Sequence, residues 1–178
     1  MANARKPVLY VVMLAFAAVW LVFFPNAPYI LTDFQHLSVS IDGIPVWYNV
    51  ILLIWFAWTA LLLGIISLYF MQEIVARALG NLTSWLFVIL VTGLSSFGIY
   101  VGRFMRWNSW DTWNQPLPLA RDIWAEISHP LANKEAFVFT IIFTLLFLFI
   151  YVTLVVFGNI TLERQKQRLA GTQPHHVR

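Results

Sequence analysis

Residues 95–111 read SSFGIYVGRFMRWNSWD, and an apolar helix and a polar cluster meet within this stretch. Its first half is rich in small residues, and Gly98 and Gly102 lie about one helical turn apart. A Gly-x-x-x-Gly spacing lets two helix backbones approach each other closely inside a membrane. We expect the pair to pack against another helix of the same chain in preference to a second copy.

The whole chain is too apolar for a soluble domain. It has 178 residues, of which 60% are hydrophobic and only 11% are charged, whereas soluble domains average about 25% charged residues. The formal net charge of +3 comes without a basic patch interleaved with aromatic residues, so we expect membrane lipids as partners and no nucleic acid. The absence of cysteine excludes disulfides, thiolate nucleophiles and cysteine-ligated metals.

Four apolar segments can each cross a bilayer as a helix, at about residues 7–24, 46–71, 85–102 and 137–160. The first resembles a signal peptide, but it ends in bulky residues without a small-residue cleavage site, so we expect it to be retained. Residues 119–128 have the pattern of an amphipathic helix on the membrane surface. We predict an all-α, polytopic transmembrane helical bundle of four spans plus this interfacial helix. It forms a single domain over residues 1–162, followed by a flexible, basic cytoplasmic tail over 163–178.

The basic residues indicate the orientation of the chain. With four spans, the termini and the middle connection share one side, and the other two loops share the opposite side. The first side carries Arg5, Lys6, Arg77, Arg164, Lys166, Arg168 and Arg178, and the second carries Arg103, Arg106, Arg121 and Lys134. The positive-inside rule therefore predicts that both termini are cytoplasmic and that the loops after the first and third spans lie at the outer face.

A second polar run, FPNAPYILTDFQHL at residues 24–37, lies in the first of those outer loops. Pro25 and Pro28 are expected to break the first helix, and Asn26 is expected to cap the segment that follows. If that segment is helical, one face carries Tyr29, Thr32, Asp33 and His36, at spacings of three and four. We predict that this face meets the polar end of the third span.

Arg103 and Arg106 directly follow the third span, on the side that usually avoids arginine. Their spacing of three predicts one shared helix face, and Trp107 and Trp110 continue the neighbouring surface. Arginine at membrane depth is costly, and it usually pairs with an acid, here Asp33 or Asp111, or lines a functional site. Two interpretations stay open: an ion-pair lock, or a guanidinium pair that binds phosphate or carboxylate. The candidate ligand-binding residues are Asn26, Tyr29, Arg103, Arg106, Trp107, Asn108 and Asp111.

Asp33 and His36 are the candidate catalytic residues, because a histidine beside a carboxylate suits proton transfer. The same two side chains with Asp111 could also hold a divalent metal. Two neighbouring arginines would repel a cation, so we predict neither a metal nor another cofactor. Haem is disfavoured as well, because the outer-side histidines, His36 and His129, both lie outside the apolar spans.

Three strings in the chain are similar to a bacterial integral membrane family called domain of unknown function 1361. They are FPNAPYILTDFQHL at 24–37, WFAWTALLLGIISLYFMQ at 55–72 and SSFGIYVGRFMRWNSWD at 95–111. The resemblance runs from about residue 11 through the fourth span and implies a multi-pass protein of the bacterial inner membrane. It implies no ligand or reaction. Family members tend to carry further apolar segments ahead of the N-A-P-Y string, so this chain is either a short member or one with further spans.

Three kinds of function fit these features. The first is a site at the outer leaflet that binds or processes an anionic ligand such as a lipid headgroup or a polyprenyl phosphate. The second is an accessory or assembly subunit, whose polar runs dock a membrane-protein partner or a second copy. The third is a small transporter, which is disfavoured because the second to fourth spans lack ionisable residues at mid-depth.

Overall fold

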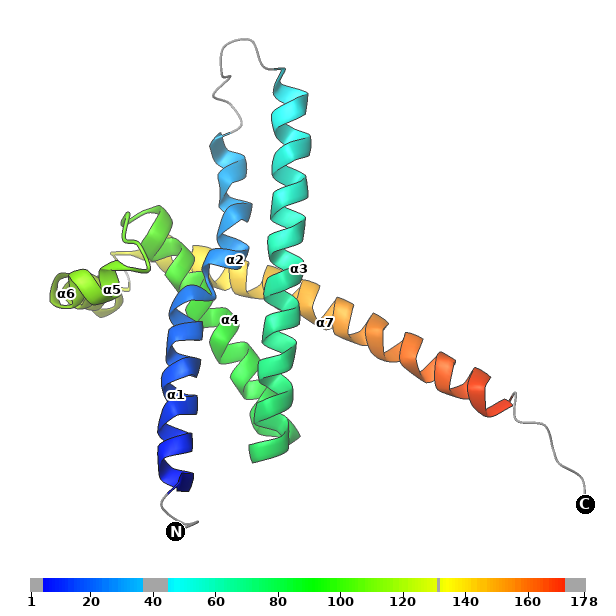
Figure 1. The fold of residues 1–178 in the computed structure, drawn as a ribbon. Coiled ribbons are helices and arrows are strands. Elements are labelled where there is room, and N and C mark those ends of the chain that lie inside the picture. Colours follow the sequence, from blue (N-terminus) through cyan, green and yellow to red (C-terminus); the bar gives the residue numbers. More distant parts are fainter. Residues whose placement is uncertain (1–4, 37–44, 131, 172–178) are drawn as a thin grey trace, which may run out of the picture.

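The computed structural model describes residues 5–36, 45–130 and 132–171, and within these ranges the chain forms helices and no strand. In chain order the helices are α1 (Arg5–Phe23), α2 (Asn26–Tyr29), the 3-10 helix η1 (Ile30–His36), α3 (Val46–Leu79), α4 (Asn81–Arg103), α5 (Asp111–Asn114), α6 (Pro116–Ser128) and α7 (Lys134–Gly171) (Figure 1). Four helical stretches are long and apolar enough to cross a membrane: Val11–Gln35, Val46–Leu79, Asn81–Arg103 and Lys134–Leu169. The predicted all-α, multi-pass membrane architecture is confirmed.

Two helices run further than the sequence predicted. The helix α3 continues to Leu79, so the expected connection over residues 72–84 is helical except at Gly80, whose φ of 90° ends the helix. The helix α7 continues to Gly171 through the region expected to be a flexible tail. Both extensions lack proline and are rich in residues of high helix propensity, so nothing in them stops the helix where the apolar run ends.

The break after α1 is a bend between helices. The chain turns at Phe24 and Pro25 and re-enters helix at Asn26, so the break predicted from the prolines is present. The predicted cap is wrong: Pro25 occupies the N-cap position of α2, and no side chain caps this helix. Because the helix resumes after two residues, Asn26 already lies within it, and its Oδ1 accepts a hydrogen bond from Ser109 Oγ at 3.3 Å.

Glycines on α3 and α4 make room for the segment that follows the bend, residues 25–36, which we call the bent segment. A Cβ on Gly64 would lie 3.0 Å from the Cβ of Ala27, and a Cβ on Gly98 would lie 3.1 Å from Cγ of Pro25. A Cβ on Gly102 would lie 3.1 Å from Cε2 of Tyr29. The expectation that the Gly98–Gly102 pair packs within the chain is therefore confirmed, and its partner is the segment that begins at Pro25.

The core lies where α3, α4 and α7 meet. Its buried apolar members are Phe24, Leu61, Ile65, Leu68, Val88, Val91 and Phe147, together with the fully buried Tyr151. The Tyr151 hydroxyl donates a hydrogen bond to Oε1 of the buried Gln72, which joins α7 to α3. Trp20 Nε1 donates to Ser67 Oγ at 2.7 Å and joins α1 to α3.

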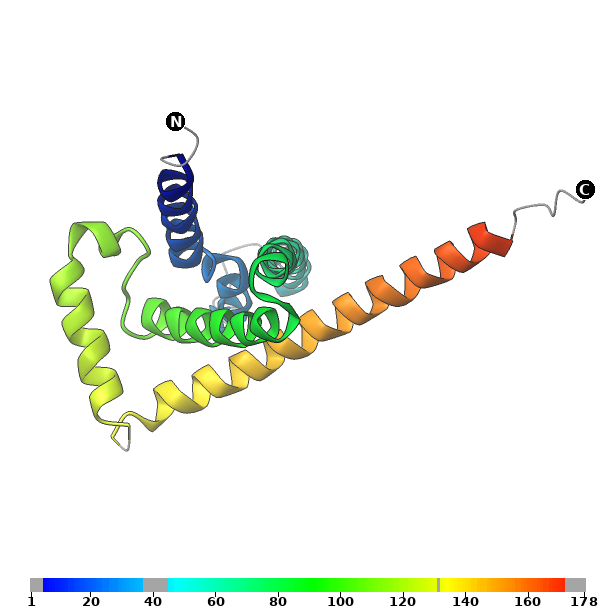
Figure 2. The same ribbon diagram turned by 90° about the horizontal axis from the view of Figure 1, so that it is seen from below.

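The helix α4 is central in the arrangement of the helices. The helix α4 packs between α3 and α7, whereas α7 crosses it obliquely and extends well past the other helices (Figures 1 and 2). The short helices α5 and α6 lie beside the end of α4, on the side away from α3 (Figure 2). The polar site lies at this end of α4, between α2, η1 and the segment that leads to α6.

Candidate functional site

Arg103, the last residue of α4, joins the two polar runs. Its Nε donates to Thr32 Oγ1 at 2.8 Å, its Nη2 forms an ion pair with Asp33, and its guanidinium lies 4.5 Å from the centre of the Tyr29 ring. The Arg103 side chain is only 11% exposed, while that of Asp33 is 39% exposed. The structure thus brings the predicted pair of Asp33 and Arg103 together, and this pair fixes the bent segment to the end of α4.

Tyr29 and Thr32, two of the Arg103 partners, lie three residues apart across the junction of α2 and η1. In a 3-10 helix, residues three apart lie nearly in line, and Thr32 Oγ1 donates to the carbonyl oxygen of Tyr29 at 2.6 Å. The same hydroxyl oxygen accepts the hydrogen bond from Arg103. Tyr29, Thr32 and Asp33 thus all contact Arg103, as the prediction required. They do not form one face of an α-helix, because Tyr29 ends α2 and Thr32 and Asp33 lie in the 3-10 helix η1.

Arg106 does not share a helix face with Arg103, so this prediction is wrong. The helix α4 ends at Arg103, and Arg106 has a φ of 61°, in the left-handed region that reverses the chain. The N–H of Trp107 then donates to the carbonyl of Val101 at 3.3 Å and closes the helix end. This turn leaves Arg106 exposed.

Both arginines nevertheless line one cleft, which we call the arginine cleft. It has a volume of about 550 Å³ and is lined by Tyr29, Gln35, Gly102, Arg103, Phe104 and Arg106. Arg103 enters it with its charge balanced by Asp33. No acidic side chain of the described residues forms an ion pair with Arg106.

Asp111 is not an arginine partner in this structure. Its Oδ2 accepts the backbone N–H of Asn108 at 2.7 Å, a contact that shapes the turn before α5. Ion pairs among the described residues include Arg103–Asp33 and the surface pair Arg77–Glu73, and neither involves Asp111. An aspartate could have paired with either arginine, but the chain reverses at Arg106, and Asp111 therefore bonds to Asn108 within its own loop.

Two hydrogen bonds hold α6 against the end of α4 and the turn that follows it. The Tyr100 hydroxyl donates to Glu126 Oε1 at 3.0 Å, and Trp107 Nε1 donates to Asp122 Oδ2 at 3.1 Å. The helix α6 has no buried residue, and its Trp124 is 72% exposed, as the amphipathic pattern of an interfacial helix requires. The predicted helix is present and begins three residues earlier, at Pro116.

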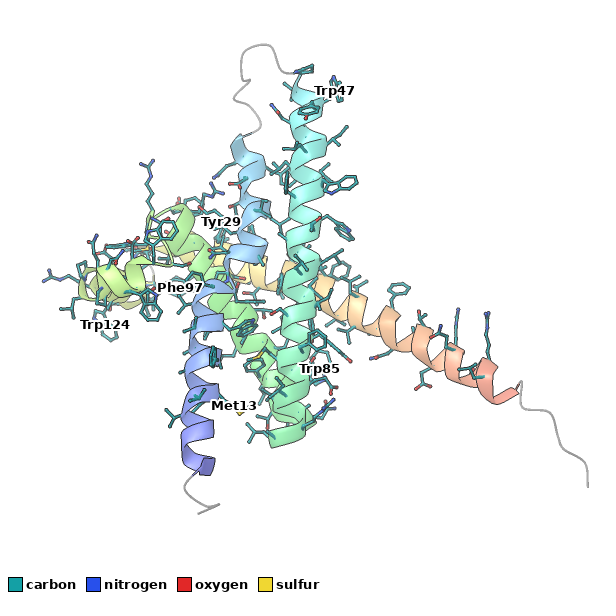
Figure 3. The ribbon with its side chains drawn as sticks, in the orientation of Figure 1. Met13, Tyr29, Trp47, Trp85, Phe97 and Trp124 are labelled. Carbon is teal, nitrogen blue, oxygen red and sulfur yellow. The ribbon has the colours of Figure 1, made fainter. Side chains whose placement is uncertain are left out.

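A second cleft, which we call the apolar cleft, lies between the bent segment, α4 and α6. Its volume is about 450 Å³. Figure 3 marks Phe97 between α4 and α6, and Tyr29 near the end of α4. The lining residues are Leu21, Pro25, Asn26, Tyr29, Leu94, Phe97, Gly98, Val101, Gly102, Trp107, Asn108, Ser109, Trp110, Thr112, Leu119 and Ile123. The predicted residues Asn26, Tyr29, Trp107 and Asn108 thus share one cleft.

The candidate catalytic pair is described only in part. Asp33 is held by Arg103, whereas for His36, the last residue of η1, the structure describes the backbone and not the side chain. Among the described side chains, no group of three His, Asp or Glu residues could hold a metal ion.

Several lining residues were not among the predicted site residues. Gln35 lies in the arginine cleft, and Phe97, Leu119 and Ile123 lie in the apolar cleft. The signal for Phe97 was its place beside Gly98 on the small-residue face of α4. The amphipathic pattern of α6 showed that Leu119 and Ile123 share a face but not that this face closes a cleft.

Comparisons with known proteins agree with the resemblance in the three strings. No curated protein and no solved structure matches the chain. A family model described as "Protein of unknown function (DUF1361)" matches residues 1–150, which is most of the chain and includes both polar runs. The chain belongs to this DUF1361 family.

Proposed function

We propose that the protein binds an anionic ligand, such as a lipid headgroup or a polyprenyl phosphate, in the arginine cleft at the outer face of the bacterial inner membrane. The observation that carries the proposal is Arg106: an exposed guanidinium in a cleft of about 550 Å³, without an acidic ion-pair partner among the described residues. A guanidinium matches phosphate or carboxylate bidentately, and it stays charged at every physiological pH.

The two arginines have different roles in this proposal. The Arg103 charge is balanced by Asp33, so this residue adds little net attraction for an anion. Its contacts with Thr32 and Tyr29 keep the wall of the cleft in place. Arg106 supplies the attraction, and Gln35 adds an amide donor on the opposite polar run. In this arrangement Asp33 acts through Arg103 as a positioning residue.

The test uses methyl phosphate, a phosphate probe without a hydrocarbon chain, titrated into the detergent-purified protein. We expect Arg106→Gln to weaken binding about tenfold or more, since a hydrogen bond to a charged group contributes about 1.5–3 kcal/mol. Arg77→Gln is the matched control, because Arg77 forms a surface ion pair with Glu73. Equal affinity of the unmodified protein and both variants would contradict the proposal.

A second candidate function, an accessory subunit, is favoured by one observation. In each of the stretches Val11–Gln35 and Lys134–Leu169, only 11% of the 18 most apolar consecutive residues are buried. Much of the surface of α1 and α7 is therefore left to lipid or to a partner helix. Light scattering on gently solubilised protein measures the mass of the particle. A stoichiometric complex with one other membrane protein, unaffected by Arg106→Gln, would favour this function over ligand binding.

A further inference from the structure

The apolar cleft adjoins the arginine cleft, and together they have the shape of a site for an amphiphile. We propose that the ligand is a single-chain amphiphile whose phosphate or carboxylate head lies at Arg106 and whose hydrocarbon chain lies in the apolar cleft beneath α6. This inference rests on the proposed function and adds the class of ligand to it. The apolar cleft has a volume of about 450 Å³, within the range of about 300–1,000 Å³ typical of small-molecule sites.

The floor of the apolar cleft is one stripe of α4. Leu94, Phe97, Gly98, Val101 and Gly102 recur at helical spacing, so they lie on one face. From first to last the stripe is about 12 Å long, at 1.5 Å per residue. A cleft along a single helix stripe accommodates one extended chain, and Pro25 and Tyr29, which pack against Gly98 and Gly102, form a wall beside it.

The two clefts meet at Tyr29 and Gly102, which line both of them. A Cβ on Gly102 would lie 3.1 Å from Tyr29 Cε2 and 3.4 Å from the carbonyl oxygen of Trp107, so a larger residue would crowd this junction. The two clefts are therefore adjacent across the Tyr29–Gly102 contact, and the chain of a ligand with its head at Arg106 would pass this contact to reach the apolar cleft.

The polarity of the apolar cleft changes along its length. Asn108, Ser109 and Thr112 line it on the loop side, next to the end of α4. Leu94 lies two turns further down α4, where Leu21 of α1 completes the wall. Polar groups near the head and apolar groups further down match an amphiphile inserted chain first.

The helix α6 forms the outer wall through two of its apolar residues. Leu119 and Ile123 line the cleft, whereas Leu117 is 82% exposed and is not among its lining residues. The polar contacts Tyr100–Glu126 and Trp107–Asp122 hold this wall in place. Leu117 and Leu119 are thus matched positions: the same residue type on the same helix, inside and outside the cleft.

The experiment compares methyl phosphate with decyl phosphate on the full chain in detergent, with decanol as a neutral competitor. Decyl phosphate should bind about tenfold more tightly or better, since each methylene removed from water changes affinity about four-fold. Leu119→Trp should fill the cleft and remove most of this advantage without affecting methyl phosphate. Leu117→Trp should change neither affinity, and decanol should compete more weakly than decyl phosphate, because it lacks the charged head.

A decyl phosphate with a photoreactive diazirine at its terminal carbon gives a second readout on the unmodified protein. We expect labelling near Leu94 and Phe97 on α4. Labelling on lipid-facing parts of α3 or α7 instead would overturn the inference. The inference would also be overturned if decyl phosphate still bound more tightly than methyl phosphate to the Leu119→Trp and Ile123→Trp variants. Didecyl phosphate binding as tightly as decyl phosphate would overturn the restriction to one chain.

The two proposals fail in different ways. If Arg106→Gln weakens both phosphates but the chain adds nothing, the anion site stands and the chain site is wrong. If Arg106→Gln leaves methyl phosphate binding unchanged, the anion site itself is wrong, and the chain proposal is withdrawn with it.

Discussion

Replacing Asp33 with alanine removes the carboxylate that balances a nearly buried guanidinium. The Arg103 side chain is 11% exposed, and its hydrogen bond to Thr32 and its contact with the Tyr29 ring do not supply a negative charge. The variant thus lacks the carboxylate of the Arg103–Asp33 ion pair at the end of α4. We expect the free energy of unfolding to fall, because a charge taken out of water needs a partner.

The size of the loss follows from the exposure of the two side chains. Removing one partner of a fully buried ion pair costs about 3–5 kcal/mol. Asp33 is 39% exposed, so water that enters its place can solvate part of the Arg103 charge. We therefore expect a loss of about 2–3 kcal/mol, below the value for a fully buried pair. The double variant Asp33→Ala/Arg103→Ala should lose less than the sum of the single variants, by about 1–2 kcal/mol.

The assay is reversible unfolding in mixed micelles, followed by circular dichroism. Glu73→Ala is the control, because the Arg77–Glu73 pair has side-chain exposures of 81% and 43% and should contribute about 0.5 kcal/mol or less. If Asp33→Ala were no more destabilising than Glu73→Ala, Arg103 would not depend on its carboxylate partner. The bent segment would then be held by packing and by its other hydrogen bonds, Arg103–Thr32 and Ser109–Asn26.

Two further predictions use the same unfolding assay. Gly98→Ala should be less stable than Gly93→Ala by about 1–2 kcal/mol, because its Cβ would meet the rigid ring of Pro25 at 3.1 Å, whereas a Cβ on Gly93 meets nothing within 4 Å. Equal stabilities would show that the bent segment yields readily. Tyr151→Phe should cost about 1–2 kcal/mol, because it leaves the buried Gln72 amide without its donor. Adding Gln72→Leu should recover much of that loss, and no recovery would mean that the Tyr151 hydroxyl acts elsewhere.

The spans and the pairing of the two polar runs could be predicted because each rests on a strong local signal. Long apolar segments have few alternatives to a membrane helix. The small residues at Gly98 and Gly102 predicted a close helix contact. A nearly buried arginine needs an acid, and Asp33 was available in the polar run on the same side of the membrane. These signals depend on composition and short spacing, which are directly visible in the sequence.

The local course of the chain between helices could not be predicted in the same way. A spacing of three implies a shared face only while the helix continues, and the left-handed conformation of Arg106 ends that relation. Left-handed backbone at a residue other than glycine has no clear sequence signal. The reversal decided that Asp111 bonds to Asn108 and that Trp107 reaches Asp122. The apolar cleft depends on this reversal too, because it places α6 opposite Phe97.

The ion-pair lock and the anion site, which the sequence left as alternatives, separate onto different residues. Arg103 has its counter-charge and its structural contacts, so removing its partner Asp33 should first lower stability. Arg106 lies beyond the helix end, exposed in the same cleft, so its removal should lower anion affinity and leave stability nearly unchanged. The guanidinium of Arg103, held by Asp33, keeps the cleft wall rigid, and the exposed guanidinium of Arg106 in the following turn is available to a ligand. A loss of stability in Asp33→Ala, together with a loss of anion affinity but not of stability in Arg106→Gln, would support this division. A purely structural cluster would lower stability in both variants.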